Sequence, residues 1–233
     1  MRVAVLAAHR NTASRCHEWI ARVGALRDWY EHSGYSVRAV AGEGDSVDDT
    51  RNVLAEKAVL AGLDLEIVDT THNGPYFGSC EDPQRLRQLS FVFNTMLDEL
   101  RSTDDIVVYA ENDLLWTPTM MSALIDHAAN RTGGFDVYCP FILIGDGEQF
   151  YDIWGFRGLD GGRWGPFKPY HNELNGAHFT EVSSAGSCLA MRAEVARECR
   201  IKDDMALVGW CEDVRNHGYR IAACSDLVVR HPA

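Results

Sequence analysis

The first half of the chain alternates short apolar runs with longer segments in which apolar residues recur every three or four positions. The short runs, at residues 3–7, 36–41, 65–68 and 106–110, are typical of buried strands. The longer segments have the spacing of amphipathic helices, and they lie at residues 12–32, 47–61 and 83–101. Ser46 is the expected N-cap of the second helix. This order predicts an α/β fold with a mostly parallel sheet and helices on both faces.

The second half of the chain has a less regular pattern. Regular structure is expected as a helix at 117–130, a strand-like segment at 184–191, a helix from Ala193, a short helix at 212–217 and a last strand at 220–229. Residues 145–180 are rich in Gly, Trp, Tyr, Phe and His and show weak periodicity, so we expect a long loop-rich segment over the site. The pattern contains no repeat and no linker, and 233 residues can form one domain with a sizeable core.

Composition and charge narrow the functional classes. The formal net charge is −12, which gives no electrostatic help in binding nucleic acid or an anionic membrane. The apolar run at the N-terminus is too short for a membrane span and lacks the features of a signal peptide, so a soluble, cytoplasmic protein is expected. The seven cysteines form no CxxC pair, and buried reduced thiols are expected.

Charged residues follow several of the predicted strands. Arg10 follows the first strand, Glu43 and Asp45 follow the second, and Glu111 and Asp113 follow the fourth. Ligands of open parallel sheets bind beyond the carboxyl ends of the strands. These positions are therefore candidates for a binding site.

The triplet Glu111-Asn112-Asp113 closes the fourth apolar run. Residues i and i+2 point to the same side of an extended chain, so the two carboxylates can face one divalent cation. Such a cation absorbs the charge that develops on a diphosphate leaving group. The alternative interpretation is a solvated acidic turn.

Residues 41–50 carry a second acidic cluster. Acids directly after a strand can accept hydrogen bonds from a nucleobase or from ribose hydroxyls. The alternative is a loop with a helix cap, which explains Asp48 and Asp49 near the start of the second helix. It does not explain Glu43.

Further candidates lie near the C-terminus. Glu212 and Asp213 are expected at a helix N-terminus, where the helix dipole stabilises carboxylates. They can also contact a sugar, and one of them can serve as a general base. His231 ends the last strand, and a neutral imidazole would complete a metal site built from carboxylates.

With these segments in this order, the sequence resembles the GT-A glycosyltransferases, and in particular the fungal mannosyltransferase families of the mannan-polymerase and capsule type. The matching segments are EGDSVDDT at 43–50, Asn94 in a helix, END at 111–113, YDIW at 151–154, SAGSCLAMR at 184–192, CEDVRNHGYRI at 211–221 and VVRH at 228–231. The sequence departs from these families at Phe93-Asn94, where they have Arg-Asn, and at Glu111, where they have Asp.

The resemblance implies a GT-A (Rossmann-like) domain over residues 1–233, with a nucleotide-sugar-binding half at 1–115 and an acceptor-side half at 116–233. The residues implied in nucleotide-sugar binding are Arg10, Glu43, Asp45, Asn94, Glu111 and Asn112. The implied ligands of Mn²⁺ or Mg²⁺ are Asp113, Glu111 and His231. On the sugar and acceptor side the resemblance implies Asp152, Trp154, Arg157 and Gly186, with Glu212 and Asp213 as the catalytic acids.

The aromatic residues of the loop-rich segment allow two interpretations. Side chains such as Tyr151, Trp154, Phe156, Trp164 and Tyr170 can stack on the face of a sugar, or they can anchor the loop itself.

The implied activity is metal-dependent transfer of a hexose or similar sugar from a UDP- or GDP-sugar to a hydroxyl acceptor, which is a glycan, a small molecule or a modified nucleobase. Two alternatives stay open. One is a nucleotidyltransferase that forms the sugar nucleotide, although LAAHRNTAS at 6–14 lacks the glycines of a triphosphate-binding loop. The other is a non-catalytic module that binds carbohydrate or nucleotide. Retention and inversion of the anomeric centre are both compatible with the sequence.

Overall fold

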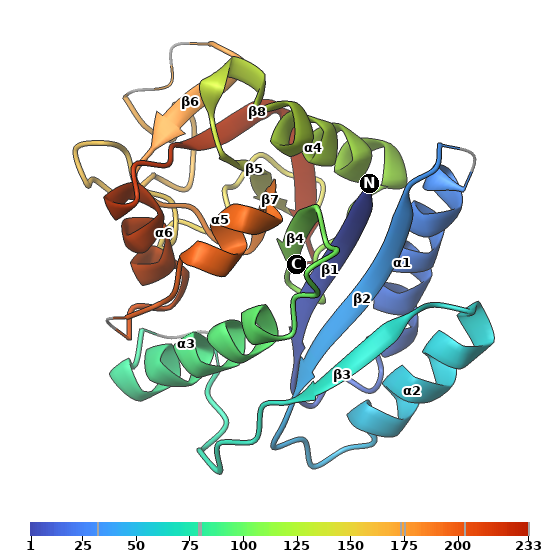
Figure 1. The fold of residues 1–233 in the computed structure, drawn as a ribbon. Coiled ribbons are helices and arrows are strands. Elements are labelled where there is room, and N and C mark those ends of the chain that lie inside the picture. Colours follow the sequence, from blue (N-terminus) through green and yellow to red (C-terminus); the bar gives the residue numbers. More distant parts are fainter. Residues whose placement is uncertain (32, 79–80, 173, 175, 203, 233) are drawn as a thin grey trace.

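The computed structural model describes residues 1–31, 33–78, 81–172, 174, 176–202 and 204–232. These residues form an eight-stranded sheet in the order β3-β2-β1-β4-β7-β5-β8-β6 (Figure 1). The strands are β1 (Arg2–His9), β2 (Ser36–Glu43), β3 (Leu65–Asp69), β4 (Ile106–Ala110), β5 (Val137–Ile144), β6 (Phe179–Val182), β7 (Cys188–Arg192) and β8 (Ile221–His231). The helices are α1 (Cys16–Tyr30), α2 (Thr50–Ala61), α3 (Pro83–Asp98), α4 (Pro118–Asn130), α5 (Ala193–Glu198) and α6 (Ala206–Asn216), with a 3₁₀ turn at Thr132–Gly134.

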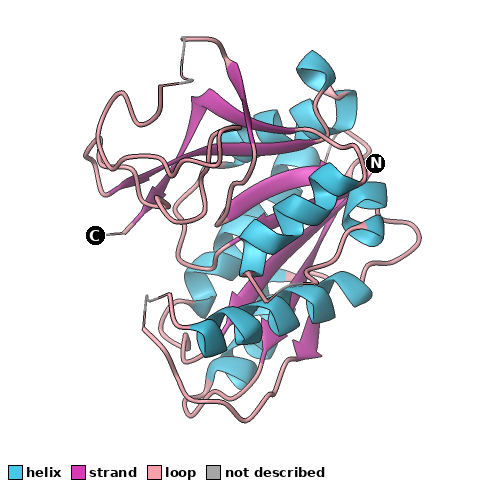
Figure 2. Cartoon of the chain, turned by 90° about the vertical axis from the view of Figure 1, so that its left-hand side faces the viewer, coloured by secondary structure: helices cyan, strands magenta, loops and turns pink. Residues whose placement is uncertain are grey.

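The strands of the first half pair as predicted. β1 runs parallel to both β2 and β4, and β2 runs parallel to β3. α1 contacts α2 and α4 on one face of the sheet, and α3 contacts α5 and α6 on the other. Figure 2 shows helices on both sides of the strands. β1 and β4 are therefore covered on both faces, which is why they appear in the sequence as continuous apolar runs.

Two helices begin later than predicted. α1 begins at Cys16 and α2 at Thr50, with Asp49 at the N-cap position of α2. The prediction of Ser46 as that N-cap is wrong, because the Ser46 hydroxyl accepts the backbone N–H of Asn11 at 3.0 Å. This bond ties the loop after β2 to the loop after β1, and both loops lie at the carboxyl edge of the sheet.

The second half departs further from the predicted order. β7 lies between β4 and β5 and runs antiparallel to both, so the sheet is mixed. β5 and β6 lie where the pattern predicted no separate strands. α6 begins at Ala206 rather than at residue 212. Periodicity alone does not distinguish a short buried strand from a short buried helix, and this ambiguity accounts for these differences.

The loop-rich segment is confirmed between β5 and β6, where the described residues form only isolated bridges and turns. An aromatic cluster anchors it, with ring centroids 4.9–5.8 Å apart. The cluster consists of Phe141, Phe150, Phe156, Trp164 and Tyr170, all buried. Phe156, Trp164 and Tyr170 therefore hold the loop together.

Two further predictions concern the state of the cysteines and membrane-spanning helices. Six of the cysteines are buried and unbridged, which confirms the expectation for these six; Cys80 lies outside the described residues. None of the described helices has the length and apolar character needed to cross a membrane.

Candidate functional site

The carboxyl ends of β1, β2 and β4 meet at one edge of the sheet. In the parallel register of β1 and β2, His9 lies opposite Glu43. Glu111 directly follows β4, and its backbone N–H donates to the carbonyl of Ser187 at 2.9 Å, just before β7. The site thus combines the predicted parallel strands with the antiparallel β7.

Asn112 ties the end of β4 to the end of β1. Its side-chain Nδ2 donates to the carbonyl of Ala8 at 2.6 Å, and its own carbonyl accepts a hydrogen bond from Arg22 of α1 at 2.9 Å. Among the described residues, its Oδ1 is enclosed without a hydrogen-bond partner. Asn112 therefore positions the triplet and leaves one acceptor for a ligand.

Asp113 lies between a histidine and an arginine. Its Oδ2 is 3.4 Å from His231 Nε2 and 3.4 Å from Arg15 Nη1. Its Oδ1 is enclosed and has no hydrogen-bond partner in the described part of the chain. The structure thus brings together two of the three residues expected to bind a metal, and it leaves a carboxylate oxygen free for a ligand.

His231 also contacts the loop-rich segment. Its ring stacks on Tyr151 with a centroid distance of 3.8 Å and an interplanar angle of 11°. The backbone N–H of Tyr151 in turn donates to Ile142 of β5 at 2.8 Å. The YDIW segment is thereby held next to the triplet.

The two carboxyl groups of the triplet differ in their electrostatics. Burial raises the pKa of Glu111 to about 8, and the charges of Asp113 and Asp152 add to this effect. Burial also acts to raise the pKa of Asp113, but the hydrogen bond and charge of His231 and the charge of Arg15 outweigh it and lower that pKa. Asp113 is therefore the carboxylate that is ready for a cation, whereas Glu111 must first lose a proton.

His9 is a buried polar residue that sequence reasoning did not select. It is 3% exposed, and its ring packs edge-on against Trp19 with centroids 4.7 Å apart. Burial lowers its pKa to about 3 against the opposing charge of Asp113, so the imidazole is neutral. Nδ1 lies 3.0 Å from the Thr12 hydroxyl, and Nε2 is enclosed and has no hydrogen-bond partner among the described residues.

A cavity of about 530 Å³ opens beside Glu111. Its walls come from α3, the start of α6, the YDIW segment and the loop before β7, and its polar groups include Glu111, Asp152 and Ser187. A cavity of this size at the carboxyl edge of an open sheet is the expected place for a ligand.

Asp152 and Gly186, both predicted on the sugar and acceptor side, line this cavity. Asp152 accepts hydrogen bonds from the Gly155 N–H at 2.9 Å and from the Ser187 hydroxyl at 3.0 Å. Burial raises its pKa, although these two bonds oppose the rise. A Cβ at residue 186 would lie 2.4 Å from Asp152 Oδ2, so only glycine allows this carboxylate position.

Trp154 lines the cavity, and Arg157 does not. The Arg157 guanidinium lies 5.8 Å from the Trp154 ring centroid, and its backbone pairs with Ser184. Arg157 therefore supports Trp154 and the loop rather than lining the cavity.

Arg10 and Asp45, which were expected to hold the nucleoside, are engaged with the loop after β3. Arg10 donates to the carbonyls of Gly74 at 2.7 Å and Pro75 at 3.1 Å. Asp45 accepts the backbone N–H groups of His72 and Asn73, each at 3.1 Å. These bonds shape the loop after β3, although Arg10 Nε is enclosed and has no hydrogen-bond partner among the described residues.

Glu43 and Asn94 have different surroundings. Glu43 is 5% exposed at the end of β2 and pairs with Arg51 at 3.1 Å. Asn94 donates to the carbonyl of Ile201 and accepts its N–H, both at 3.0 Å, and it does not line the cavity. Asn94 therefore clamps the segment before α6 to α3.

Glu212 and Asp213 do not reach the cavity. Because α6 begins at Ala206, these residues lie in the body of the helix and not at its N-terminus, so that expectation is wrong. The cavity is lined by Ala206 and Leu207, about 10 Å away along the helix axis from Asp213.

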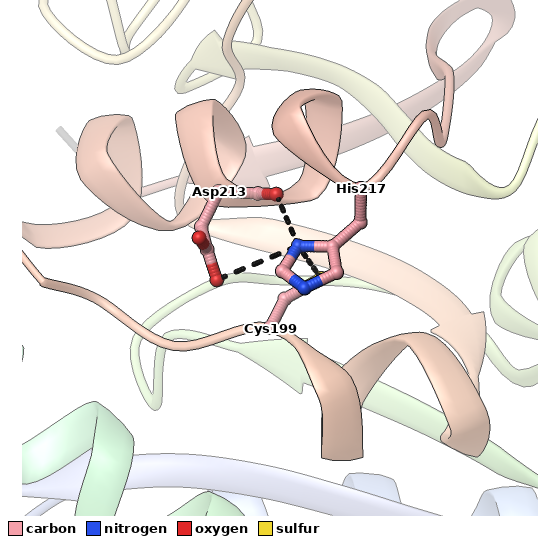
Figure 3. A group of neighbouring side chains, drawn as sticks. All are labelled: Cys199, Asp213 and His217. Atoms are coloured by element: carbon pink, nitrogen blue, oxygen red, sulfur yellow. Dashed lines mark hydrogen bonds and ion pairs between the residues drawn. The ribbon is translucent and has the colours of Figure 1, made fainter.

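Asp213 instead belongs to a cluster with Cys199 and His217 (Figure 3). The three side chains offer ligand atoms within 4.8 Å of one another, but each is already engaged. The Asp213 carboxylate accepts Lys202 Nζ at 2.6 Å and the Arg200 N–H at 2.9 Å. His217 Nδ1 lies 2.8 Å from the Asp213 carbonyl, and burial raises the pKa of the Cys199 thiol to about 12. This cluster fastens α6 to α5 and is separate from the triplet.

Residues of the site that were missed include His9, Arg15, Arg85 and Ser187. His9 had a signal, because it is the polar residue that ends the first apolar run. Ser187 lies in the SAGSCLAMR segment, from which only Gly186 was selected. Arg15 had no signal, since its contact with Asp113 arises from packing between elements far apart in the sequence.

No protein-family model matches the sequence, and no curated protein matches it. Solved structures match along nearly the whole chain. The mannosyltransferase PcManGT from Pyrobaculum calidifontis, solved with GDP-Man and Mn²⁺, matches with a TM-score of 0.62 and 17% identity over 98% of this chain and 56% of that chain. TarS from S. aureus matches with a TM-score of 0.58 and 14% identity over 100% of this chain and 60% of that chain.

Glucosyl-3-phosphoglycerate synthase from Mycobacterium tuberculosis, solved with Mn²⁺, UDP and glucosyl-3-phosphoglycerate, matches with a TM-score of 0.56 and 15% identity over 100% of this chain and 70% of that chain. The chain thus spans 56–70% of the length of these three structures. The likeness shows that the fold is of the GT-A type. The finer resemblance to the fungal mannosyltransferase families stays a prediction.

Proposed function

We propose that this protein is a metal-dependent glycosyltransferase that moves a hexose or similar sugar from a nucleotide-sugar donor to a hydroxyl acceptor. The observation that carries the proposal is the environment of Asp113. Its Oδ1 is enclosed without a described partner, and its Oδ2 faces His231 and Arg15, at the strand end that borders the cavity.

The donor set fits a divalent cation. Asp113 and His231 would hold it, with Glu111 joining after loss of its proton, and oxygen with one imidazole suits Mn²⁺ or Mg²⁺. PcManGT was solved with GDP-Man and Mn²⁺, and the mycobacterial synthase with UDP and either Mn²⁺ or Mg²⁺. When bound, the cation neutralises charge on the diphosphate leaving group.

Residues 1–115 would bind the donor, and residues 116–233 would bind the sugar and the acceptor. On the donor side, Glu43 accepts hydroxyl hydrogen bonds from the nucleoside, and Arg15 lies where a diphosphate next to Asp113 would meet it. On the sugar and acceptor side, Asp152 and Ser187 bind hydroxyl groups. With Glu212 and Asp213 outside the cavity, Asp152 is the carboxylate we assign to receive the acceptor's proton.

A donor screen tests the proposal. Thermal unfolding is measured with UDP-, GDP- and other nucleotide-sugars, with and without Mn²⁺. A true donor at a hundred times its Kd stabilises the native state by about 2.7 kcal/mol, which raises the midpoint by roughly 5–10 °C in a chain of this size. The shift should require Mn²⁺ and should disappear in Asp113→Asn.

Asp126→Asn is the matched control, because Asp126 is exposed on α4, away from the triplet. A full metal-dependent shift in Asp113→Asn, or an unchanged shift in chelator, would contradict the proposal. Release of pyrophosphate from a nucleoside triphosphate and a sugar phosphate would identify a nucleotidyltransferase instead.

A further inference from the structure

One face of α3 lines the cavity with apolar side chains. They come from successive turns of the helix, and they are Leu86, Leu89, Val92, Phe93 and Met96. Arg85, in the first turn of α3, also lines the cavity. Spacings of three and four residues place these apolar side chains along one side of the helix, so the part of α3 that follows Arg85 gives the cavity an apolar wall. Phe93 is held in this wall by edge-on contacts with Tyr109 at 5.1 Å and Trp210 at 5.8 Å.

Other elements extend the apolar surface around the cavity. Leu207 of α6 and Ile153 and Trp154 of the YDIW segment also line it. Ile153 is 40% exposed, so apolar surface continues to the outside. The polar groups that line the cavity include Glu111 after β4, Asp152 of the YDIW segment, Ser187 before β7, Glu81 just before α3, and Arg85 in the first turn of α3. The charge of Arg85 acts on both Glu111 and Asp152, so these groups lie near one another. The cavity therefore has a polar end and an apolar side.

Neither a sugar nor a nucleoside satisfies the apolar wall. Each hydroxyl that is buried without a hydrogen-bond partner weakens binding, commonly by about tenfold or more. A nucleobase also has a polar edge, and Glu43, the residue assigned to the nucleoside, is not part of this cavity. The volume of about 530 Å³ suits a ligand of drug-like size. The wall is therefore left for a part of the acceptor that is not sugar-like.

Resting on the glycosyltransferase function proposed above, we infer that the acceptor is amphiphilic: a hydroxyl group attached to an apolar body. The hydroxyl lies at the polar end, next to Asp152 and Ser187, and the apolar body packs against α3 and Leu207. A fully buried methylene then strengthens binding about fourfold, the equivalent of about 0.8 kcal/mol.

Alkyl glucosides with methyl, butyl and hexyl chains, used below the concentrations at which they form micelles, test this inference. Calorimetry in the presence of Mn²⁺ and the nucleoside diphosphate of the best donor should show affinity that rises two- to fourfold per methylene, with a negative heat-capacity change. Equal affinity for the methyl and hexyl glucosides would overturn the inference.

Two substitutions in the wall make the test specific. Leu89→Asn and Leu207→Asn place a polar group at partly exposed wall positions and should flatten the dependence on chain length. The Mn²⁺-dependent thermal shift caused by the donor should stay within a degree or two of the parent protein, and this shift also reports that the variants fold. Leu60→Asn, at a residue 73% exposed on α2, is the matched control and should leave both measurements unchanged.

The outcomes separate the two proposals. If the wall variants weaken donor binding and keep the chain-length dependence, the wall holds the nucleobase and the inference fails. If no nucleotide-sugar binds at all, the proposed function fails. The chain-length series, repeated without nucleotide, then still decides whether the cavity selects an apolar ligand.

Discussion

Asp113 Oδ2 lies 3.4 Å from His231 Nε2, although one residue follows β4 and the other ends β8, with β7 and β5 between these strands in the sheet. A short backbone bridge makes this possible. Leu115 and Arg230 exchange two backbone hydrogen bonds, of 2.7 and 3.0 Å, and so draw the end of β8 toward the triplet. The pairing of Asp113 with His231 is thus set by the backbone, not by a flexible contact between side chains.

Replacing His231 with alanine should weaken Mn²⁺ binding, because it removes an imidazole that is held beside Asp113 by the Tyr151 stack. We expect a loss of roughly ten- to a hundredfold in metal affinity, the usual effect of losing a group that supports a metal ligand. Titration of Mn²⁺ followed by electron paramagnetic resonance measures it. His178→Ala, at an exposed histidine paired with Asp226, should leave the affinity unchanged. Equal losses in both variants would contradict the assignment of His231.

Glu111→Gln should change how stability depends on pH in the absence of metal. The pKa of Glu111 in the folded protein is raised to about 8, above its value in the unfolded chain, so ionisation disfavours the folded state. The parent protein should therefore lose stability as the pH rises from about 4.3 to about 8, whereas the variant should not lose this part.

Unfolding by urea in the presence of a chelator, from pH 5 to pH 8.5, measures this difference. The variant should become more stable than the parent toward pH 8.5, and the two should converge near pH 5. With Mn²⁺ and a donor present, the order should reverse, because only the parent can supply a second carboxylate ligand beside Asp113. Parallel profiles for parent and variant would show that Glu111 is not the group with the raised pKa.

Gly186→Ala should impair the part of the cavity that we propose binds the sugar and acceptor. The new Cβ would lie 2.4 Å from Asp152 Oδ2, so the carboxylate must move away from Ser187. We expect transfer to fall by about a hundredfold, as when a reacting group is misplaced by about 1 Å. Donor binding with Mn²⁺ should change little. Gly24→Ala is the control: nothing lies within 4 Å of the added Cβ in α1, and alanine stabilises a helix by about 0.5–1 kcal/mol relative to glycine.

Asp213→Asn should reduce stability and leave donor binding intact. Its carboxylate joins Lys202 and the Arg200 N–H next to α6, so its loss should cost about 1–2 kcal/mol at pH 7, with the exposure of Lys202 limiting the effect. Burial acts to raise the pKa of Asp213, but the hydrogen bonds from Lys202 and Arg200 outweigh it and lower the pKa.

A lowered pKa in the folded state stabilises the protein above the pKa of the unfolded chain, near 3.9, and this contribution is lost as the pH falls below it. The difference in unfolding midpoint between parent and Asp213→Asn should therefore shrink in acid. Glu212→Gln, at the exposed neighbouring residue, should match the parent in stability and in transfer. Loss of transfer in Glu212→Gln would instead support the original assignment of these acids to catalysis.

The sequence alone predicted the parallel half of the sheet, because its strands are covered on both faces and leave uninterrupted apolar runs such as the one in β4. It also predicted that ligand groups follow those strands. Asp113 was chosen for its residue type and its position after the fourth strand, whereas Asp152 was implied only by the family resemblance, and both lie at the candidate site. The positions of the parallel strands depend on the order of apolar and polar residues along the chain, which determines the hydrophobic periodicity.

The features that hydrophobic periodicity did not predict depend on packing between elements far apart in the sequence. β7 lies antiparallel between β4 and β5, and α6 begins at Ala206. Both features depend on contacts between residues far apart in the sequence. The same holds for residues whose polar atoms form hydrogen bonds within the protein. Asn94 clamps Ile201 and Asp45 holds the loop after β3, so each matched a binding motif while its hydrogen bonds were already satisfied.

The sequence by itself therefore determined which residue types stand at the strand ends, because strand order and polarity are properties of the chain. Only the tertiary structure decided which of them remain free for a ligand. Asp113 Oδ1 is enclosed and has no hydrogen-bond partner among the described residues. The Asp213 carboxylate, in contrast, already accepts hydrogen bonds from Lys202 and Arg200. A hydrogen bond needs its partner in space, and that partner is known only once the chain has folded.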